Sequence, residues 1–175
     1  MTVEDEAGFR EFVAARLPRM SGAAYLLTGD HHAAQDLVQQ ALVKLARHWR
    51  RVSRAGAPDA YVRRVIYHEH VSAWRRRRGA ELSTAAPPER AGPRDEAADT
   101  VRRLMLREAL ARLTPRQRAV IVLRFYEDMS ESDTAEALGC SVGTVKSQTH
   151  HALGRLRAVA PELADLVRDT QEVHR

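Results

Sequence analysis

The chain has 175 residues, enough for one medium domain or two small ones, and 44% of them are apolar, which supports packed cores. Only 5% are aromatic, so Leu, Val, Ile and Ala must form those cores, as in helical bundles. The net charge of +5 suits a polyanionic partner or a well-solvated surface. The single cysteine, Cys140, excludes an intramolecular disulfide, and the acidic N-terminus lacks the apolar run of a signal peptide or membrane span, so we expect a soluble cytoplasmic protein.

The periodic signals along the chain are helical, and no alternating apolar pattern is long enough for a strand, so the fold class is expected to be all-α. Apolar residues from Phe9 to Leu27 predict a first helix, in which Pro18 should cause a kink or a split. Thr28-Gly29-Asp30 predicts the end of this helix and the N-cap of the next.

A second helix is predicted at about 31–50. One face is apolar and consists of Ala34, Leu37, Val38, Ala41, Leu42, Leu45 and Trp49. The opposite face is polar apart from one valine and includes Asp36, Gln39, Gln40, Val43 and Arg47. A loop at 51–58 should separate this helix from a third one, which begins at Pro58 or Asp59.

The third predicted helix ends in four consecutive arginines, Arg75 to Arg78. Residues 1–78 carry 14 basic and 8 acidic side chains, and adjacent arginines repel one another unless a polyanion is near. The helix also supplies Tyr61, Arg64, His68 and Trp74, which suit contacts to bases and phosphates. For Tyr61 and Trp74, a place in the hydrophobic core is an equally good interpretation.

Residues 79–99 are rich in Ala, Pro, Gly and acidic residues and have no apolar stripe, which predicts a flexible acidic linker. We therefore expect two small helical domains, 1–78 and 100–160, followed by a tail at 161–175. In the second domain, Thr114-Pro115-Arg116-Gln117 has the pattern of a capping box, and Ser130 and Ser141 can cap two further helices.

The segment 131–150 predicts a helix-turn-helix. This motif needs a small residue where the helices touch, a residue that tolerates positive φ in the turn and a buried anchor on the second helix; Ala135, Gly139 and Val145 meet these needs. Leu138 and Cys140 are expected to pack around the turn. The alternative is an ordinary helical hairpin that ends in a glycine cap.

The helix that begins near Ser141 has two distinct predicted faces. Its inner face should contain Val142, Val145, Thr149, Ala152, Leu153 and Leu156. Its outer face and flanks present side chains able to contact base edges and phosphates: Thr144, Lys146, Ser147, Gln148, His150, His151 and Arg155. The alternative for this outer face is a merely solvated surface.

Two stretches are similar to one known family. LTGDHHAAQDLVQQALVKLARHW (27–49) and LTPRQRAVIVLRFYEDMSESDTAEALGCSVGTVK (113–146) resemble the N- and C-terminal domains of extracytoplasmic-function (ECF) sigma factors of bacterial RNA polymerase. The resemblance extends over about 9–157 and includes a linker of suitable length. It implies a sigma region 2 domain at 1–78, which binds core polymerase and melts the −10 element, and a sigma region 4 domain at 100–160, which recognises the −35 element.

The resemblance also implies roles for the residues named above. Asp36, Gln39, Gln40, Val43 and Arg47 would bind the clamp coiled coil of the largest polymerase subunit, and the flap of the second-largest subunit would be a further contact. The −10 element would be contacted by Tyr61, Arg64, His68, Trp74, Arg75 and Arg76, and the −35 element by the outer face of the last helix. Family members usually have asparagine at position 68 and often arginine at position 151. Whether an anti-sigma factor is a partner stays open.

The sequence offers no convincing catalytic or cofactor site. His68 and His70 are two apart on a helix and point in different directions, and adjacent pairs such as His150-His151 cannot chelate one metal well. We expect Cys140 to be a small, buried hydrophobic residue rather than a metal ligand. We therefore expect no enzyme activity, no cofactor and no metal. The alternative functions are a stand-alone regulator like the LuxR type, which the helix-turn-helix also resembles, and a helical platform for partner proteins.

Overall fold

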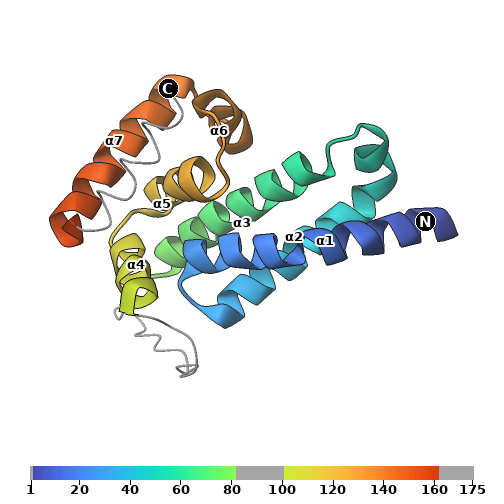
Figure 1. Cartoon of the computed structure of the whole chain (residues 1–175), viewed down its shortest axis with the longest axis horizontal. Coiled ribbons are helices and arrows are strands. Elements are labelled where there is room, and N and C mark those ends of the chain that lie inside the picture. Colours follow the sequence, from blue (N-terminus) through green and yellow to red (C-terminus); the bar gives the residue numbers. More distant parts are fainter. Residues whose placement is uncertain (1, 82–100, 162–175) are drawn as a thin grey trace. The chain divides into compact units, whose positions relative to one another are not determined.

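The computed structural model describes residues 2–81 and 101–161, and every regular element in these two ranges is a helix (Figure 1). The all-α expectation is confirmed for them. The contacts divide the chain into unit 1, Met1–Ala73, and unit 2, Trp74–Arg175. From residue 82 onward the predicted linker lies outside the described residues, as does the predicted tail from residue 162 onward. The three predicted boundaries between the segments of the chain stay predictions.

Unit 1 begins with α1, Val3–Thr28, which is not split at Pro18. Pro18 is exposed, so the carbonyl that loses its partner can face water, and residues further along the helix (Met20, Ala23, Ala24 and Leu27) are buried. Of the two predicted effects of Pro18, the split is therefore wrong, and the kink stays a prediction. Gly29 ends the helix in the left-handed region at φ 70°, and Asp30 caps the next helix by accepting a hydrogen bond from the Ala33 N–H at 2.8 Å.

The second helix, α2, is His31–Arg54 and lies alongside α1 (Figure 1). Its apolar face is buried as predicted, except that Leu42 is only half-buried and Val52 joins the stripe. Because Val52 continues the buried face, the helix runs four residues past the predicted end. The predicted loop 51–58 therefore shrinks to 55–57. Trp49 packs edge-on against Phe9, with ring centroids 5.4 Å apart, and also contacts Phe12.

The third helix, α3, is Pro58–Glu81, and it begins where the sequence predicted. Val62, Ile66 and Tyr67 are almost completely buried in unit 1. Two ion pairs join this helix to its neighbours: Arg16 on α1 lies 3.1 Å from Asp59, and Lys44 on α2 pairs with Glu69. The buried residues and these pairs fix which face of α3 remains accessible.

Unit 2 contains α4, Val101–Ala111, α5, Pro115–Ile121, α6, Glu131–Leu138, and α7, Val142–Val159. The capping predictions are confirmed. Thr114 and Gln117 form a reciprocal capping box, and Ser130 and Ser141 accept hydrogen bonds from the N–H groups of Asp133 and Thr144. The five residues after α5, Val122–Tyr126, form a π-helical turn, η1, which the sequence did not predict.

Replacing Asp30 by alanine should lower the free energy of unfolding of unit 1 by about 1 kcal/mol, because the Ala33 N–H loses its acceptor at the start of α2. Denaturant titration followed by tryptophan fluorescence measures the change, since Trp49 is buried in this unit. The matched control is Gln35→Ala, an exposed position on the same helix. An equal effect of both substitutions would contradict the capping role.

Candidate functional site

The turn between α6 and α7 has the geometry that a helix-turn-helix requires. Gly139 has φ 63° and ψ 43°, a left-handed conformation that few other residues adopt, and the Cys140 N–H donates to the Ala135 carbonyl at 3.0 Å. Val120, Ala135 and Val145 form one buried cluster, and Leu138 and Cys140 pack against it. The predicted packing around the turn is confirmed.

Cys140 is half-buried at this turn, and its environment suits a hydrophobic role. Burial raises the pKa of the Cys140 thiol, because the thiolate would lose solvation, although the positive charge of Arg116 acts in the opposite direction. The side chain is therefore a neutral thiol at neutral pH. Its contacts with Val120, Ala135 and Val145 agree with the interpretation of Cys140 as a small packing residue.

The two faces of α7 are largely those predicted. Val145, Thr149, Ala152, Leu153 and Leu156 are buried, and the Thr149 hydroxyl is satisfied by donating to the Val145 carbonyl at 2.8 Å. The exception is Val142, which is 39% exposed because it stands at the first position of the helix, beyond the contact with α6. Of the residues predicted for the outer face and flanks, Gln148 is half-buried. The others are exposed, namely Thr144, Lys146, Ser147, His150, His151 and Arg155.

Three of these side chains already make contacts within unit 2. The Lys146 ammonium lies 3.6 Å from the Glu131 carboxylate on α6. The Arg155 guanidinium donates to the Arg112 carbonyl at 3.3 Å, and Thr144 shares a hydrogen bond with Ser141 at 2.9 Å. Sequence patterns could not show the first two contacts, because each depends on how α7 packs against other parts of unit 2. His150 and His151 lie next to each other, with ring centroids 5.7 Å apart.

The outward face of α2 forms a second candidate surface, in unit 1. Asp36, Gln39, Gln40, Val43 and Arg47 are all exposed, as the helical pattern predicted. Val43 is 52% exposed, which makes it an apolar side chain surrounded by polar ones. A mixed surface of this kind is suited to a protein partner, which would bury the valine and pair with the polar rim.

The residues predicted for the −10 element lie along α3 and differ in accessibility. Arg64, His68 and Arg76 are exposed. Tyr61 is half-buried, and its ring meets that of His48 on α2 at a centroid distance of 6.1 Å. The side chains of Trp74 and Arg75 lie outside the described part of the chain. Neither of the two predicted roles for Trp74 is therefore tested.

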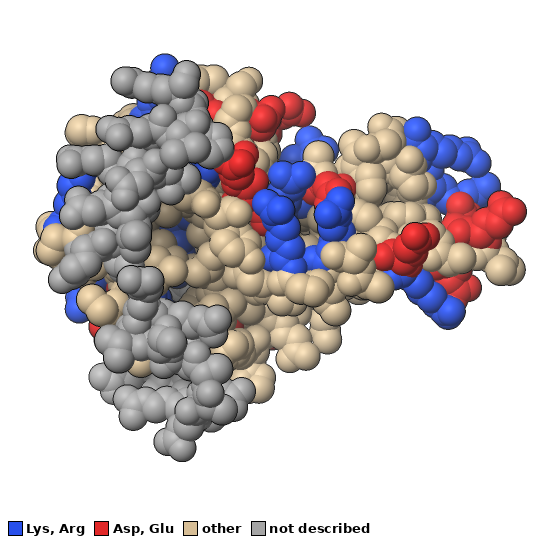
Figure 2. Space-filling model, in the orientation of Figure 1, with Lys and Arg blue, Asp and Glu red and all other residues tan. Residues whose placement is uncertain are grey.

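A row of three arginines lies at the end of α2, and two of them, Arg51 and Arg54, were missing from the predicted sites. Arg47, Arg51 and Arg54 are exposed at helical spacing, and Figure 2 shows basic side chains gathered where α2 ends. The signal was present in the sequence HWRRVSR, but the end of the helix was placed too early to put these arginines on one face. The row adds positive charge to the surface of unit 1.

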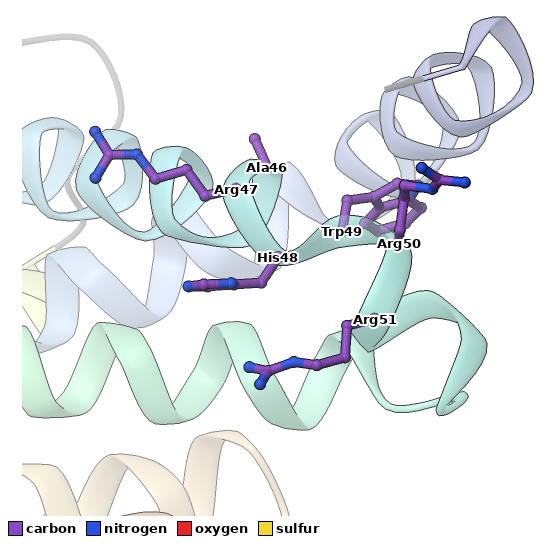
Figure 3. Close-up of a pocket in the computed structure, with 6 residues that line it drawn as sticks. All are labelled: Ala46, Arg47, His48, Trp49, Arg50 and Arg51. Atoms are coloured by element: carbon purple, nitrogen blue, oxygen red, sulfur yellow. The ribbon is translucent and has the colours of Figure 1, made fainter.

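The same stretch lines a surface hollow of about 300 Å³, bounded by Ala46, Arg47, His48, Trp49, Arg50 and Arg51. In Figure 3 these side chains leave the helix in several directions, and Arg47 and Arg51 do not converge. Arg50 is engaged elsewhere, because its guanidinium lies 3.3 Å from Asp5 at the start of α1. The hollow therefore lacks the convergent polar groups of a small-molecule site.

Within residues 2–81 and 101–161, no helix combines the length and the apolar content needed to cross a membrane. The same ranges hold no group of three or more His, Cys, Asp or Glu side chains arranged to bind a metal ion.

Comparisons with known proteins identify the class to which this fold belongs. Residues 12–80 match the family model described as Sigma-70 region 2, and residues 103–156 match Sigma-70, region 4. The chain is 41% identical over 150 residues to an RNA polymerase sigma-E factor of Streptomyces coelicolor, covering 85% of this chain and 84% of the relative. It is 34% identical to the ECF RNA polymerase sigma factor SigL of Mycobacterium tuberculosis, covering 80% and 81%.

Solved structures agree on the fold. The sigma factor RpoE of Bartonella quintana, crystallised with the anti-sigma factor NepR, matches with a TM-score of 0.74 at 24% identity, over 89% of this chain and 98% of that one. CnrH, solved with the cytosolic domain of CnrY, gives a TM-score of 0.61 at 23% identity, over 87% of each chain. The chain belongs to the ECF sigma factors of bacterial RNA polymerase. Its function is promoter-directed transcription initiation, and the match of 12–80 to region 2 disfavours a stand-alone regulator.

Proposed function

We propose that the exposed face of α7 recognises the −35 element in the major groove, with Lys146, Ser147 and His150 facing the base edges. The observation that supports this assignment most directly is the division of α7: a buried stripe anchors it to α5 and α6, and the opposite side is polar and exposed. Such side chains can both donate to and accept from bases, and Arg155 suits a phosphate. Thr144, Gln148 and His151 complete the proposed contact set.

We infer that unit 1 binds core polymerase through the outward face of α2. Val43 would be buried at the centre of the contact, and Asp36, Gln39, Gln40 and Arg47 would form its polar rim. The family resemblance assigns this face to the clamp coiled coil of the largest subunit. The flap of the second-largest subunit would be a further contact for the protein.

We also propose that α3 and the end of α2 bind the −10 element as single-stranded DNA. Arg64, His68 and Arg76 are exposed along α3, and Arg51 and Arg54 extend the same kind of charge on α2. Melting the −10 element needs both stacking contacts to bases and charge contacts to phosphates, because unstacking a base costs a few kcal/mol that these contacts must offset. Tyr61, Trp74 and Arg75 remain in this proposed set.

The remaining partner and activity assignments follow from the class of protein. RpoE and CnrH were each solved with a partner, NepR being an anti-sigma factor, so we propose that an anti-sigma factor can bind this chain too. Nucleotide polymerisation would belong to core polymerase, and the chain would supply no catalysis of its own. We propose that the chain acts in the cytoplasm, together with core polymerase.

A mobility-shift experiment tests this function against that of an independent regulator. The purified chain, core polymerase and their mixture are each incubated with the same promoter fragment. We expect a promoter-specific shift only with the mixture. A specific shift with the chain alone, unchanged by core polymerase, would contradict the proposal.

Replacing His151 by alanine should reduce promoter-specific transcription about tenfold, which corresponds to the loss of one contact in the groove. Binding of core polymerase should stay unchanged, because the α2 face is intact. Run-off transcription and co-purification with core measure the two effects. The control is Glu11→Ala, which truncates an exposed polar side chain on α1, a helix with no part in either proposed surface. Equal loss of both activities, or loss of neither, would count against a DNA contact.

A further inference from the structure

The ion pair between α6 and α7 connects an acidic residue to the proposed DNA surface. Glu131 is the first residue of α6, and its Oε2 atom lies 3.6 Å from Lys146 Nζ. Both side chains reach solvent, with relative exposures of 37% for Glu131 and 64% for Lys146. Figure 2 shows acidic side chains gathered over α6, whose acidic residues are Glu131, Asp133 and Glu136. The pair therefore lies at an accessible edge, and the fold does not require it as a buried tie.

A carboxylate in this place opposes the binding of DNA in two ways. It pairs with the Lys146 ammonium, so a phosphate or base must either share that ammonium with the carboxylate or displace the carboxylate. It also stays close to any phosphate that Lys146 reaches, within about 7 Å, which is shorter than the screening length at physiological salt. Two like unit charges at that distance in water weaken binding about threefold, and more where water is excluded.

We propose that Glu131 sets the affinity of the −35 surface by competing with DNA for Lys146. This inference rests on the proposed function of α7. Among the described residues, Glu131 makes an ion pair to that face, whereas Asp133 accepts instead from the hydroxyl of its own cap, Ser130, at 2.7 Å. Promoter binding is then weaker and less dependent on salt than the basic residues of α7 alone would make it.

The test uses the full-length chain assembled with core polymerase, with promoter affinity measured at several salt concentrations. Glu131→Gln should bind the promoter about threefold more tightly. The slope of log K against log salt should steepen by up to about 0.9, as for one more neutralised phosphate. The matched control is Glu136→Gln, which removes the same charge from the same helix, about 140° around its axis. It should leave the affinity within the error of wild type.

A double-mutant cycle shows whether the effect acts through the ion pair. In a Lys146→Ala background, Glu131→Gln should change promoter affinity by less than in the wild-type background. Equal effects in both backgrounds, an equal effect of Glu136→Gln, or no effect of Glu131→Gln would each overturn the proposal. The single substitution Lys146→Ala distinguishes a failure of this inference from a failure of the proposed function of α7. If it weakens promoter binding while Glu131→Gln does nothing, only this inference fails; if it has no effect, the proposed role of Lys146 fails.

Discussion

The double substitution Gln40→Asp and Val43→Asp is expected to abolish co-purification of the chain with core RNA polymerase. Val43 is half-exposed at the middle of the α2 face, where a partner would remove it from water. Two carboxylates buried there without partners would cost several kcal/mol, and each lost anchor a further ~2 kcal/mol, which together weaken binding by more than about a thousandfold. Pull-down of core polymerase by the tagged chain measures the loss.

The control for this experiment adds the same charges to a different face of unit 1. Ala14→Asp with Ala15→Asp places two carboxylates at exposed positions of α1. That variant should still bind core polymerase. Thermal melting should show both double variants to be folded, because all four positions are exposed and surface substitutions change stability little. Normal recovery of core polymerase with the Gln40/Val43 variant would exclude the α2 face as the docking surface.

The second large effect is expected from Val145→Asp. Val145 is fully buried against Val120 and Ala135, so the substitution puts an unpaired carboxylate into the centre of the helix-turn-helix. A cost of about 3–5 kcal/mol is a large fraction of the stability of a small domain. We expect unit 2 to unfold and transcription from promoters that depend on the −35 element to be lost. The α2 face of unit 1 should still bind core polymerase.

Val142→Asp is the matched control, since it adds the same side chain to the first position of the same helix. Val142 is 39% exposed, and an acidic residue in the first turn is favourable to the helix dipole. Circular dichroism should show a normal helix content for this variant and a reduced one for Val145→Asp. Wild-type transcription by Val145→Asp would contradict the packing of the motif.

The parts of the fold that the sequence predicted are those determined by local chemistry. Gly139 ends α6 because its φ is positive, and Thr114, Ser130 and Ser141 cap helices through bonds to N–H groups three residues further on. Such contacts depend on neighbours in the chain, so a short pattern specifies them. The buried face of α7 follows in the same way from helical periodicity, apart from the exposed Val142 at its end.

The errors arose where distant residues decide the outcome. Pro18 should disrupt a helix locally, but α1 packs along α2 and continues through it. The burial of Val52 extends α2, and the π-helical turn at Val122–Tyr126 has no short sequence signal of its own. In that turn the Glu127 N–H donates to the Val122 carbonyl, and Arg124 donates to the Met129 carbonyl.

For the candidate surfaces too, local features could be predicted from the sequence and contacts between distant residues could not. The sequence was sufficient to find the exposed residues of α2 and α7, because exposure follows from periodicity. It could not show that Lys146 pairs with Glu131 or that Arg155 donates to Arg112, since those contacts join separate parts of unit 2. Because of these two contacts, the charge that Lys146 and Arg155 present at the surface depends on the residues with which they pair.

Run-off transcription on genomic DNA with purified core polymerase, followed by mapping of the RNA 5′ ends, tests the central claim most directly. We expect transcripts from a limited number of defined start points, preceded by two shared sequence elements at −35 and −10, when the chain and core polymerase are combined. Core polymerase without the chain should give none of them. A purified, folded chain that neither binds core polymerase nor produces any defined start point would contradict the account.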